Sequence, residues 1–391
     1  MISVREIIVK GVRFLNCKIQ ELAIFKIKII RNVFKKKNSK TVLISFIISP
    51  FQSEISFSHT NQNECYFAAK FFDELGYNVD VVNYNQKKIK INYSEYEILY
   101  GFGEPIENYY LKYKKDKTGP KVILYLNGSY LMYSNLKGAL RVKNVYQVKG
   151  FFLPYSARIS NVNWTWSHHM ADALIVLGNE TIAETYKELR HQNISSLNAF
   201  FYKNKNINIG DKDYNIAKKN YLWFGSSGSI HKGLDLVLEY FLNHPELELH
   251  VCGIQEQNFE YLHEMEFKKL NIHNHGCIDI YGDTFVKLMM LCGFCVFPSV
   301  SEGGGVSVLT CLGNGGLIPI ISKSTGLDVD EFGFIIDEIS LLSLSDAMEA
   351  SQRKSNDELK ILSENVQYEV SKIYSIDNYC IDLKKIIQKN I

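Results

Sequence analysis

The fold is indicated most clearly by the run Tyr221-Leu-Trp-Phe224. It is followed directly by Gly225-Ser-Ser-Gly-Ser-Ile-His-Lys-Gly233. The apolar run indicates a strand, the glycine-rich run indicates a turn, and the amphipathic pattern over 234–241 indicates a helix. A strand, a glycine-rich turn and a helix in this order present backbone N–H groups and the positive end of a helix to a phosphate. The sequence therefore predicts an anion-binding turn at this point.

A second glycine cluster follows further along the chain, Pro298-Ser-Val-Ser-Glu-Gly-Gly-Gly305, again between an apolar run and a helical pattern. Glu302 in this cluster is placed to accept hydrogen bonds from sugar hydroxyls, and the glycines let a ligand approach the backbone. An exposed turn glutamate is the alternative interpretation of Glu302, and an exposed first-turn lysine is the alternative for Lys232. Because both clusters occur in one α/β pattern, we predict a nucleotide-sugar half-domain over 221–322.

Apolar runs alternate with helical patterns along the rest of the chain. The predicted strands are 42–48, 78–82, 97–101, 121–126, 173–177, 221–224, 247–252, 278–281, 294–297, 317–321 and 334–336. The predicted helices include 63–75, 181–190, 234–241, 356–373 and 377–389. This alternation is typical of parallel, doubly wound sheets that bind ligands at the carboxyl ends of their strands. The predicted fold class is α/β, with two Rossmann-like domains facing across a cleft.

The polar segment 203–220 predicts the boundary between the two domains, because it is rich in Lys, Asn and Asp and lacks apolar periodicity. It separates a first Rossmann-like domain over 41–202, expected to hold an acceptor, from a second over 221–375, expected to hold the donor. Residues 376–391 predict a C-terminal helix. A cleft between two such domains would house a reaction of two substrates.

Residues 1–40 differ in character from the rest of the chain. They contain eleven Lys and Arg and two Glu, a net charge of +9 within a total of +2, so the remaining residues carry −7. Apolar residues recur every three or four positions, which predicts one basic amphipathic helix. Such a helix suits an anionic membrane surface. A helix docked on its own protein, or a solvated leader, is the alternative.

The composition narrows the class of protein. The mildly acidic body gives no general nucleic-acid signature. The eight cysteines have no disulfide-scaffold spacing, and most lie in apolar runs, as expected of reduced thiols in a cytosolic protein. The sequence contains neither an apolar run of membrane-spanning length nor a recognisable signal peptide. We therefore expect a cytoplasmic protein, with peripheral contact to the inner face of the plasma membrane as an option through 1–40.

The run Phe224-Gly-Ser-Ser-Gly-Ser-Ile-His-Lys-Gly-Leu-Asp-Leu-Val-Leu-Glu239 and the run Ser299-Val-Ser-Glu-Gly-Gly-Gly305 resemble the donor domain of GT-B glycosyltransferases. The best match is the mostly retaining group-1 family, whose signature is E-G-x-G…E. In the first half, Ser58-His-Thr-Asn-Gln-Asn-Glu-Cys65 and Ala171-Asp-Ala-Leu-Ile-Val-Leu-Gly-Asn-Glu180 look like bacterial members. The resemblance extends from Val42 to the C-terminus.

The resemblance implies roles for individual residues. Lys232 matches the lysine that neutralises the donor diphosphate, and Glu302 matches the glutamate that contacts the transferred sugar. The other implied donor-site positions are Gly225, Ser226, Gly228, Gly303, Gly304, Gly305 and Thr310. A fixed lysine and aligned N–H groups would stabilise the charge that builds on a departing nucleoside diphosphate. We expect no metal and no resident cofactor, the nucleotide sugar being a co-substrate.

Four positions depart from the family pattern or stay open. Thr310 stands where the second signature glutamate usually holds the ribose, and Ser226 stands where an arginine usually accompanies the lysine. On the acceptor side, Asn127 opens the loop that often carries a histidine, and His59 follows the first predicted strand. The segment 151–158 is either an acceptor loop or a packed interdomain segment.

These observations predict a hexosyltransferase-type enzyme that transfers a sugar from a nucleotide-diphosphate donor to a saccharide or lipid-linked acceptor. The expected setting is bacterial surface polysaccharide or glycolipid biosynthesis, with retention of anomeric configuration. A catalytically silent GT-B homologue that binds a nucleotide sugar or scaffolds a partner is the main alternative, favoured by Thr310 and Ser226. A sugar-nucleotide epimerase of the same architecture is a further alternative.

Overall fold

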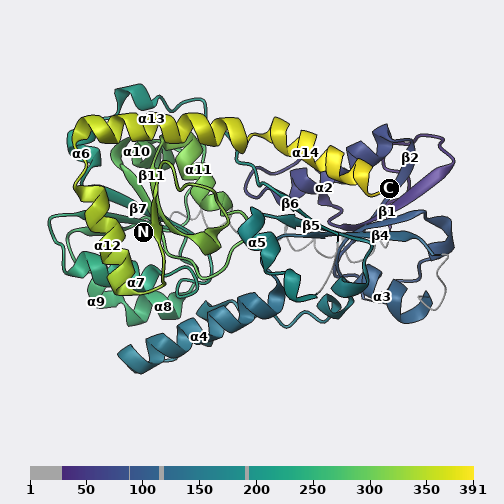
Figure 1. Ribbon diagram of the computed structural model, residues 1–391, viewed down its shortest axis with the longest axis horizontal. Coiled ribbons are helices and arrows are strands. Elements are labelled where there is room, and N and C mark those ends of the chain that lie inside the picture. Colours follow the sequence, from purple (N-terminus) through teal and green to yellow (C-terminus); the bar gives the residue numbers. More distant parts are fainter. Residues whose placement is uncertain (1–28, 88, 114–118, 190–192) are drawn as a thin grey trace, which may run out of the picture. The chain divides into compact units, whose positions relative to one another are not determined.

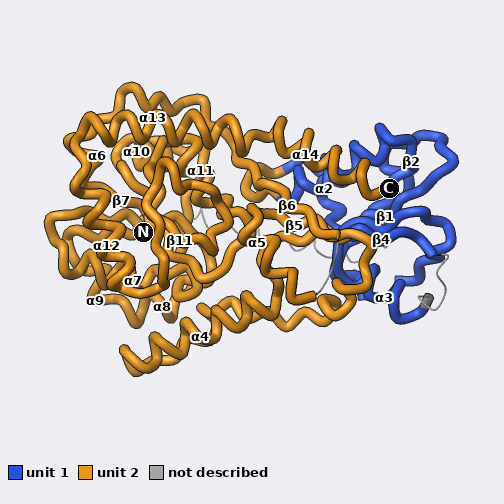
Figure 2. Tube along the Cα trace, viewed as in Figure 1, with its two compact units in different colours: residues 1–55, 61–123 blue, residues 56–60, 124–391 orange. Residues whose placement is uncertain are grey.

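The strands of the chain form two parallel sheets, seen in a computed structural model that describes residues 29–87, 89–113, 119–189 and 193–391 (Figure 1). The chain divides into two compact units (Figure 2). The first unit contains residues 1–55 and 61–123, and the second contains 56–60 and 124–391.

The first sheet has the strand order β2-β1-β3-β4-β5-β6. Its strands are β1 (Lys40–Phe46), β2 (Tyr77–Asn83), β3 (Ile98–Gly101), β4 (Lys121–Leu126), β5 (Ala173–Leu177) and β6 (Ile194–Leu197). The helices of this half of the chain are α2 (Asn61–Glu74), α3 (Glu104–Tyr113), α4 (Leu131–Lys149) and α5 (Glu180–Glu184). The boundary between the two units falls within β4.

The second sheet lies wholly in the second unit and has the order β12-β11-β10-β7-β8-β9. Its strands are β7 (Asn220–Phe224), β8 (Glu248–Cys252), β9 (Ile272–Asn274), β10 (Phe294–Phe297), β11 (Ile318–Ser322) and β12 (Phe334–Ile336). Its helices are α6 (Tyr214–Ala217), α7 (Leu234–Leu242), α8 (Gln257–Leu262), α9 (Glu264–Phe267), α10 (Asp283–Leu291), α11 (Val306–Gly315), α12 (Leu341–Gln352) and α13 (Asn356–Ile373). From β7 the chain builds outward to β9 and then returns to place β10 on the other side. This is the doubly wound order, and it reverses between β7 and β10.

The central strands are continuous apolar runs because helices cover both faces of the sheet. All residues of β10 and β11 are buried, and so are all but one residue of β7. Strands buried on both faces lose the alternation of apolar and polar residues that marks half-exposed strands. The large aromatic side chains of this core include Trp223, Tyr221 and Phe294, the last two stacked with ring centroids 4.7 Å apart.

The predicted α/β class and the two parallel sheets are confirmed. The predictions for β4, β5, β10, β12 and α13 match the observed bounds. The strand predicted over 278–281 is wrong, since the last strand on that side is β9, and β6 was not predicted. Both errors concern the outermost strands of a sheet. β6 has only four residues and β9 only three, and both contain polar residues, so each carries a weak apolar pattern.

The basic helix predicted over 1–40 is not found where the structure can test it. Residues 1–28 lie outside the described residues. Ile30 instead pairs with Val81 in an antiparallel bridge, and Arg31 forms ion pairs with Asp80 at 2.7 Å and with Glu95 at 3.0 Å. The side chain of Asp80 is nearly buried, so it ties this basic segment to the first unit. The end of the predicted helix is instead an irregular segment with a turn at 33–34, which pairs with β2 through Ile30 and is held by the ion pair of Arg31 with Asp80.

The segment 203–220 contains ordered structure of its own, namely η6 (Ile209–Asp211) and α6. Lys212 is buried, and its Nζ donates to the carbonyl oxygens of Cys292 at 2.9 Å and Gly315 at 2.6 Å. These carbonyls lie at the ends of α10 and α11, where helix C=O groups lack partners within the helix. Burial lowers the pKa of Lys212 to about 7.

The C-terminal helix α14 (Ile376–Lys389) packs against the first half of the chain within the second unit (Figure 1). Tyr379 lies 3.1 Å from Tyr125 between hydroxyl oxygens, and its ring lies 4.8 Å from that of Phe200. Asn193 donates to Asn390 at 2.7 Å. The predicted C-terminal helix thus belongs in space with β4 to β6. Within the described residues, no helix is long and apolar enough to cross a lipid bilayer.

Candidate functional site

The two glycine turns leave the second sheet side by side. β7 and β10 are adjacent and parallel, with Tyr221 opposite Phe294 and Leu222 opposite Cys295. The first turn follows β7 and leads into α7, and the second follows β10 and leads into α11. This is the point where the strand order reverses, and open α/β sheets bind their ligands there, beyond the carboxyl ends of the strands.

Lys232 is a buried cation at the end of the first turn. Its side-chain Nζ donates to Ser226 Oγ at 2.8 Å and to the carbonyl of Ser227 at 3.0 Å. Both acceptors are uncharged. Burial lowers the pKa of Lys232 to about 8, against the opposing attraction of Glu302. The charged form of a buried lysine whose hydrogen-bond partners are neutral is stabilised when an anion binds beside it.

Glu302 faces this lysine from the second turn. Its Oε1 accepts a hydrogen bond from Ser299 Oγ at 3.0 Å, and its backbone N–H donates to Ser324 at 2.9 Å. Burial by itself would raise the pKa of Glu302, but the charges of Lys232 and Arg158 hold it below the usual glutamate value. Glu302 is therefore ionised near neutral pH and retains acceptor capacity for a hydroxyl group.

Arg158 is a third charged group at this position. It follows the 3-10 helix η3 (Pro154–Ala157), and its φ of 53° lies in the left-handed region. Its Nη1 lies 3.4 Å from both carboxylate oxygens of Glu302. This is longer than the ~2.7–2.9 Å of a strong charge-assisted hydrogen bond, so the pair is loosely held. The stem of Arg158 packs on Gly228, where a Cβ would come within 2.2 Å of its Cδ.

Several N–H groups of the first turn are bonded to protein atoms, which differs from the sequence prediction of a turn open to an anion. The backbone N–H groups of Gly228 and Ser229 both donate to Glu256 Oε1, and Ser229 Oγ donates to Glu256 Oε2 at 2.8 Å. The N–H of Gly225 donates to Cys252 at 3.0 Å. The first turn therefore binds a carboxylate of the protein itself, which Glu256 supplies from the loop after β8.

The glycines of the second turn bring the chain close to the loop after β4. A Cβ on Gly303 would lie 2.3 Å from the carbonyl oxygen of Asn127. Gly304 and Gly305 have φ values of 76° and 45°, and Gly305 is the N-cap of α11. The predicted acceptor residue Asn127 is thus a neighbour of the predicted donor turn. Beside it, Ser129 Oγ donates to the carbonyl of Glu302 at 3.1 Å.

Thr310 lies on the buried side of α11, and its hydroxyl donates to Val306 at 2.8 Å. The lone pairs of that hydroxyl remain as acceptors. His231 is buried between two carbonyls, at 2.6 Å from Ser301 and 3.2 Å from Ala157. Burial lowers its pKa, and a neutral imidazole can donate from one nitrogen only, so the shorter bond to Ser301 takes the proton. His231 therefore links the segment that contains Ala157 to the segment that contains Ser301.

His59 is exposed on the loop 56–60, which belongs to the second unit. The ring of Phe57 anchors this loop, with centroids 5.1 Å from Tyr202 and 6.4 Å from Tyr281. The acceptor role of His59 stays a prediction.

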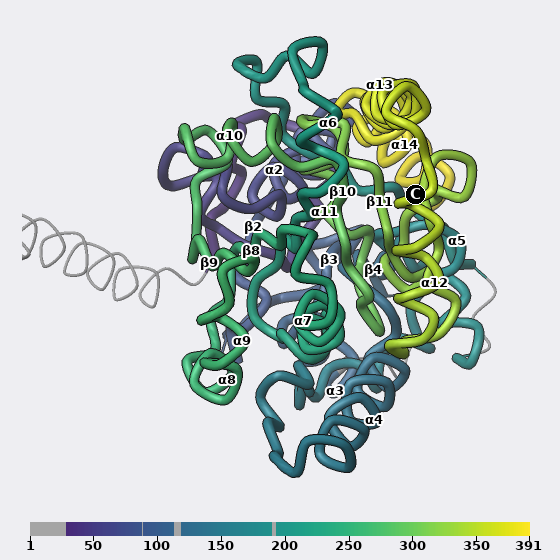
Figure 3. Tube along the Cα trace, turned by 90° about the vertical axis from the view of Figure 1, so that its left-hand side faces the viewer, coloured from purple at the N-terminus to yellow at the C-terminus, as the bar shows by residue number. Residues whose placement is uncertain are grey.

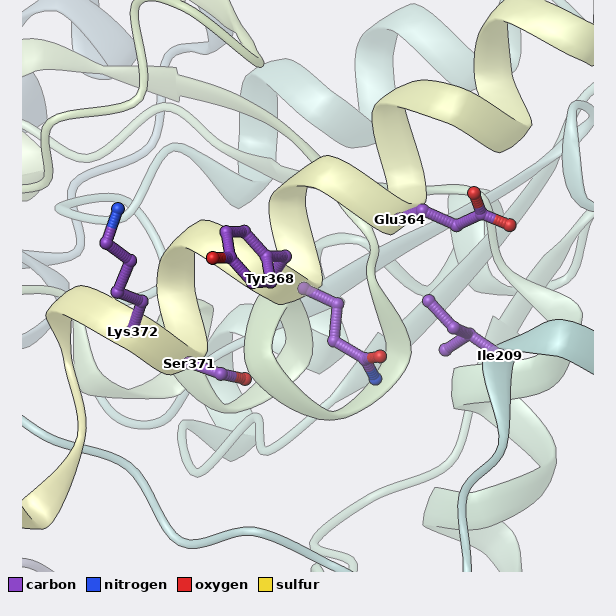
Figure 4. A pocket seen from close by; sticks show the side chains of 6 residues that line it. Ile209, Glu364, Tyr368, Ser371 and Lys372 are labelled. Atoms are coloured by element: carbon purple, nitrogen blue, oxygen red, sulfur yellow. The ribbon is translucent and has the colours of Figure 1, made fainter.

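Two further features bear on what the site can hold. Within the described ranges, no group of three or more His, Cys, Asp or Glu side chains is arranged to hold a metal ion. An open hollow of about 570 Å³ lies beside α13 (Figure 4). Its lining residues are Ile209, Glu364, Gln367, Tyr368, Ser371 and Lys372. None of these belongs to either glycine turn, so the candidate site is defined by its side chains and not by this hollow.

Sequence reasoning missed Glu256, and it singled out the segment 151–158 without giving Arg158 a role at the donor turns. Glu256 follows the carboxyl end of β8, the strand beside β7, and that position was a usable signal for a residue near the first turn. No local signal marks Arg158, which lies 144 residues before Glu302.

No protein-family model matches this sequence, and no curated protein is significantly similar to it. Solved structures do share its fold. WaaG, a glycosyltransferase involved in lipopolysaccharide biosynthesis, is 16% identical with a TM-score of 0.51, over 89% of this chain and 99% of WaaG. HepE of Anabaena, solved with UDP-glucose, is 10% identical with a TM-score of 0.55, over 90% and 99%. The catalytic domain of starch synthase IV of Arabidopsis thaliana, bound to ADP and acarbose, is 10% identical with a TM-score of 0.56, over 90% and 99%.

At these identities the likeness concerns the fold. The two parallel six-stranded sheets with their helices match the α/β fold of these glycosyltransferase structures.

Proposed function

We propose that this protein is a glycosyltransferase that moves a sugar from a nucleotide-diphosphate donor to a saccharide or lipid-linked acceptor. The observation that carries this proposal is the placement of Lys232 and Glu302 on the two turns that leave the adjacent strands β7 and β10, where the strand order of the second sheet reverses. One supplies a buried positive charge for a diphosphate, and the other supplies an ionised acceptor for sugar hydroxyls. These are the two chemical needs of a nucleotide sugar.

The bond to be broken joins the anomeric carbon of the sugar to a phosphate oxygen, and the nucleoside diphosphate leaves with the electron pair. Negative charge then builds on the phosphate, where Lys232, Arg158 and the first turn of α11 can stabilise it. Arg158 supplies a second cation although position 226 is a serine. The first N–H groups of α11 have no partners within the helix and can bond to the donor.

Glu302 would fix the transferred sugar through its hydroxyl groups, and Thr310 would accept a hydrogen bond from the ribose. The acceptor would approach from the side of Asn127, with His59 as a further contact. Retention of configuration and independence from metal are parts of this proposal that rest on the family resemblance. A bacterial surface polysaccharide or glycolipid pathway, a cytoplasmic location, peripheral membrane contact through 1–40 and the division into acceptor and donor domains are likewise proposed.

A catalytically silent homologue is the second candidate function, and one observation favours it. The N–H groups of Gly228 and Ser229 are bonded to Glu256 and are not free for a phosphate. With serine at position 226 and threonine at 310, the donor would then be bound more weakly than in an active enzyme. Such a protein would bind a nucleotide sugar or scaffold a partner without turnover.

Calorimetric titration with UDP-, GDP-, ADP- and CMP-sugars tests the shared part of both functions. We expect saturable binding of one donor, weakened in Glu302→Ala and Lys232→Ala but not in the exposed controls Glu338→Ala and Lys360→Ala. Release of free nucleoside diphosphate with an acceptor then separates the transferase from the silent homologue. Absence of binding to every donor by the folded protein would contradict the transferase.

A further inference from the structure

Helix α4 and the segment after it carry an apolar face that is exposed to solvent. Eight large apolar side chains are exposed here: Met132, Leu136, Leu140, Tyr146, Val148, Phe152, Tyr155 and Ile159. Met132, Leu136 and Leu140 follow one another at intervals of four residues and are 58%, 57% and 45% exposed. That spacing puts them on one side of the helix. Lys137 and Lys143 are also exposed, and together with the eight apolar residues they define the α4 surface.

The opposite side of α4 is fixed to the protein. Gly138, Arg141, Val142 and Val145 are buried. Arg141 forms a buried ion pair with Asp235 of α7 at 2.5 Å, and Lys149 lies 3.5 Å from Glu239 of the same helix. Two views show α4 at the edge of the second unit, beside the helices that follow β7 and β8 (Figures 1 and 3). The apolar side therefore cannot turn inward without breaking a buried ion pair.

The charge of this region has one sign. Residues 117–171 contain no Asp or Glu, although the chain as a whole contains 42. In the part of the chain that the structure describes, the acids that form ion pairs with α4 are Asp235 and Glu239, whose partners Arg141 and Lys149 lie on the side of α4 that faces the protein. Lys137 and Lys143 remain on the exposed side of the helix. An exposed apolar patch of this kind marks an interaction surface, and the charge around it selects an anionic partner.

We propose that the α4 surface docks this protein on an anionic lipid bilayer. A helix with apolar side chains outward and lysines beside them can lie in the interface, with the apolar groups below the headgroups and the ammonium groups against lipid phosphates. A second copy of the chain fits less well. A two-fold dimer through this surface would place its lysines against those of the partner copy.

The position of α4 links the bilayer to the candidate site. The helix begins directly after Tyr130, and the preceding Ser129 donates to the carbonyl of Glu302. A lipid-linked acceptor held in the bilayer would therefore present its headgroup near the second glycine turn. This consequence rests on the proposed function, whereas docking itself does not.

Vesicle co-sedimentation of the full chain tests the docking. The probes are vesicles of phosphatidylcholine alone and of phosphatidylcholine mixed equally with phosphatidylglycerol. We expect binding to the anionic vesicles, and about tenfold or greater loss of partitioning for Leu136→Glu combined with Leu140→Glu. Lys137→Glu combined with Lys143→Glu should lose about fivefold per residue. The matched control is Leu270→Glu combined with Leu342→Glu, since these leucines are 95% and 74% exposed elsewhere.

Residues 1–40 have their own basic charge, so the comparison is made between variants of the same full-length chain. The proposal is overturned if the α4 variants partition like the original protein, or if the control loses as much as they do. It is also overturned if the α4 changes only split a dimer in solution. Thermal unfolding and donor titration of each variant show whether the fold and the donor site survive. Intact donor binding with lost vesicle binding separates this proposal from the proposed function.

Discussion

Glu256 and Glu302 are both largely removed from solvent beside the same glycine turn, yet their hydrogen bonding differs. The carboxylate of Glu256 accepts from two backbone N–H groups and one hydroxyl group. That of Glu302 has one hydrogen bond of ordinary length, from Ser299, and two loose contacts with Arg158 at 3.4 Å. The cations near Glu302 lower its pKa, which keeps it charged.

This difference in hydrogen bonding distinguishes a structural carboxylate from a functional one beside the same turn. A carboxylate whose lone pairs are filled by neutral donors holds a loop in shape. A carboxylate that stays ionised with few close donors keeps capacity for a ligand. By this criterion Glu256 shapes the first turn and Glu302 is the group that meets the substrate.

Glu302→Gln should give the largest effect. The amide has nearly the same shape and can still accept from Ser299, but the negative charge is lost. We expect the transfer rate to fall roughly 10²–10³-fold, which is the usual cost of removing one group that stabilises a transition state. The measurement is nucleoside diphosphate release under saturating donor and acceptor. If the rate is unchanged and the protein loses stability instead, Glu302 is the structural carboxylate and the comparison fails.

Lys232→Met should weaken donor binding by about 2 kcal/mol, or roughly thirtyfold, since it removes a charged hydrogen-bond donor to phosphate. The pH dependence of donor affinity gives a second test of the role of Lys232. As pH rises through the pKa of about 8, the ammonium group of the free protein loses its proton and donor affinity falls. Lys232→Arg should flatten that fall, because arginine stays charged. Calorimetric titration between pH 6.5 and 9.5, roughly the range around that pKa, measures both effects.

The stability of the folded protein should show the opposite pH trend through the same lysine. Its folded pKa of about 8 lies below the ordinary value of 10.5. Between these values the unfolded chain binds the proton and the folded chain does not, so the free energy of unfolding rises with pH. Urea unfolding of the original protein and of Lys232→Met across this interval measures the contribution. A slope that is equal in both would assign the trend to other groups.

Glu256→Gln should lower the free energy of unfolding by about 1–3 kcal/mol, because an amide cannot accept all three hydrogen bonds and leaves a buried donor unsatisfied. Urea denaturation measures the loss, with Glu338→Gln as the exposed control. Donor affinity, measured in the absence of urea where the variant is folded, should change little. A loss of transfer as large as that in Glu302→Gln, without loss of stability, would contradict the structural role.

Arg158→Lys should have the smallest effect. The side chain is 41% exposed and its contact with Glu302 is long, so its attraction to a diphosphate is screened by solvent. We expect donor affinity to drop about threefold to fivefold, with Arg158→Ala slightly worse and the exposed Arg353→Ala unchanged. A loss equal to that in Lys232→Met would mean that Arg158 and not Lys232 is the principal phosphate cation.

The sequence located the parts whose signal is local. The glycine turns, the continuous apolar strands β7 and β10 and the helix α13 were all predicted from neighbouring residues, because backbone conformation and burial on both faces leave a pattern within a short window. The strands β6 and β9 were missed or misplaced, because they are short and half or more of their residues are polar. The end of the predicted N-terminal helix was wrong because Asp80, distant in sequence, holds Arg31 in a non-helical segment beside β2.

Two glycine turns that follow strands of one sheet, with Lys232 and Glu302 in them, could be predicted from the sequence. The groups that surround these residues became known from the folded chain. Folding brought Arg158 to Glu302 across 144 residues and Glu256 to Gly228 across 28, and it turned the apolar side of α4 outward. The physical reason is that a turn is shaped by its own backbone, whereas the partners of a buried charge depend on how the whole unit packs around it.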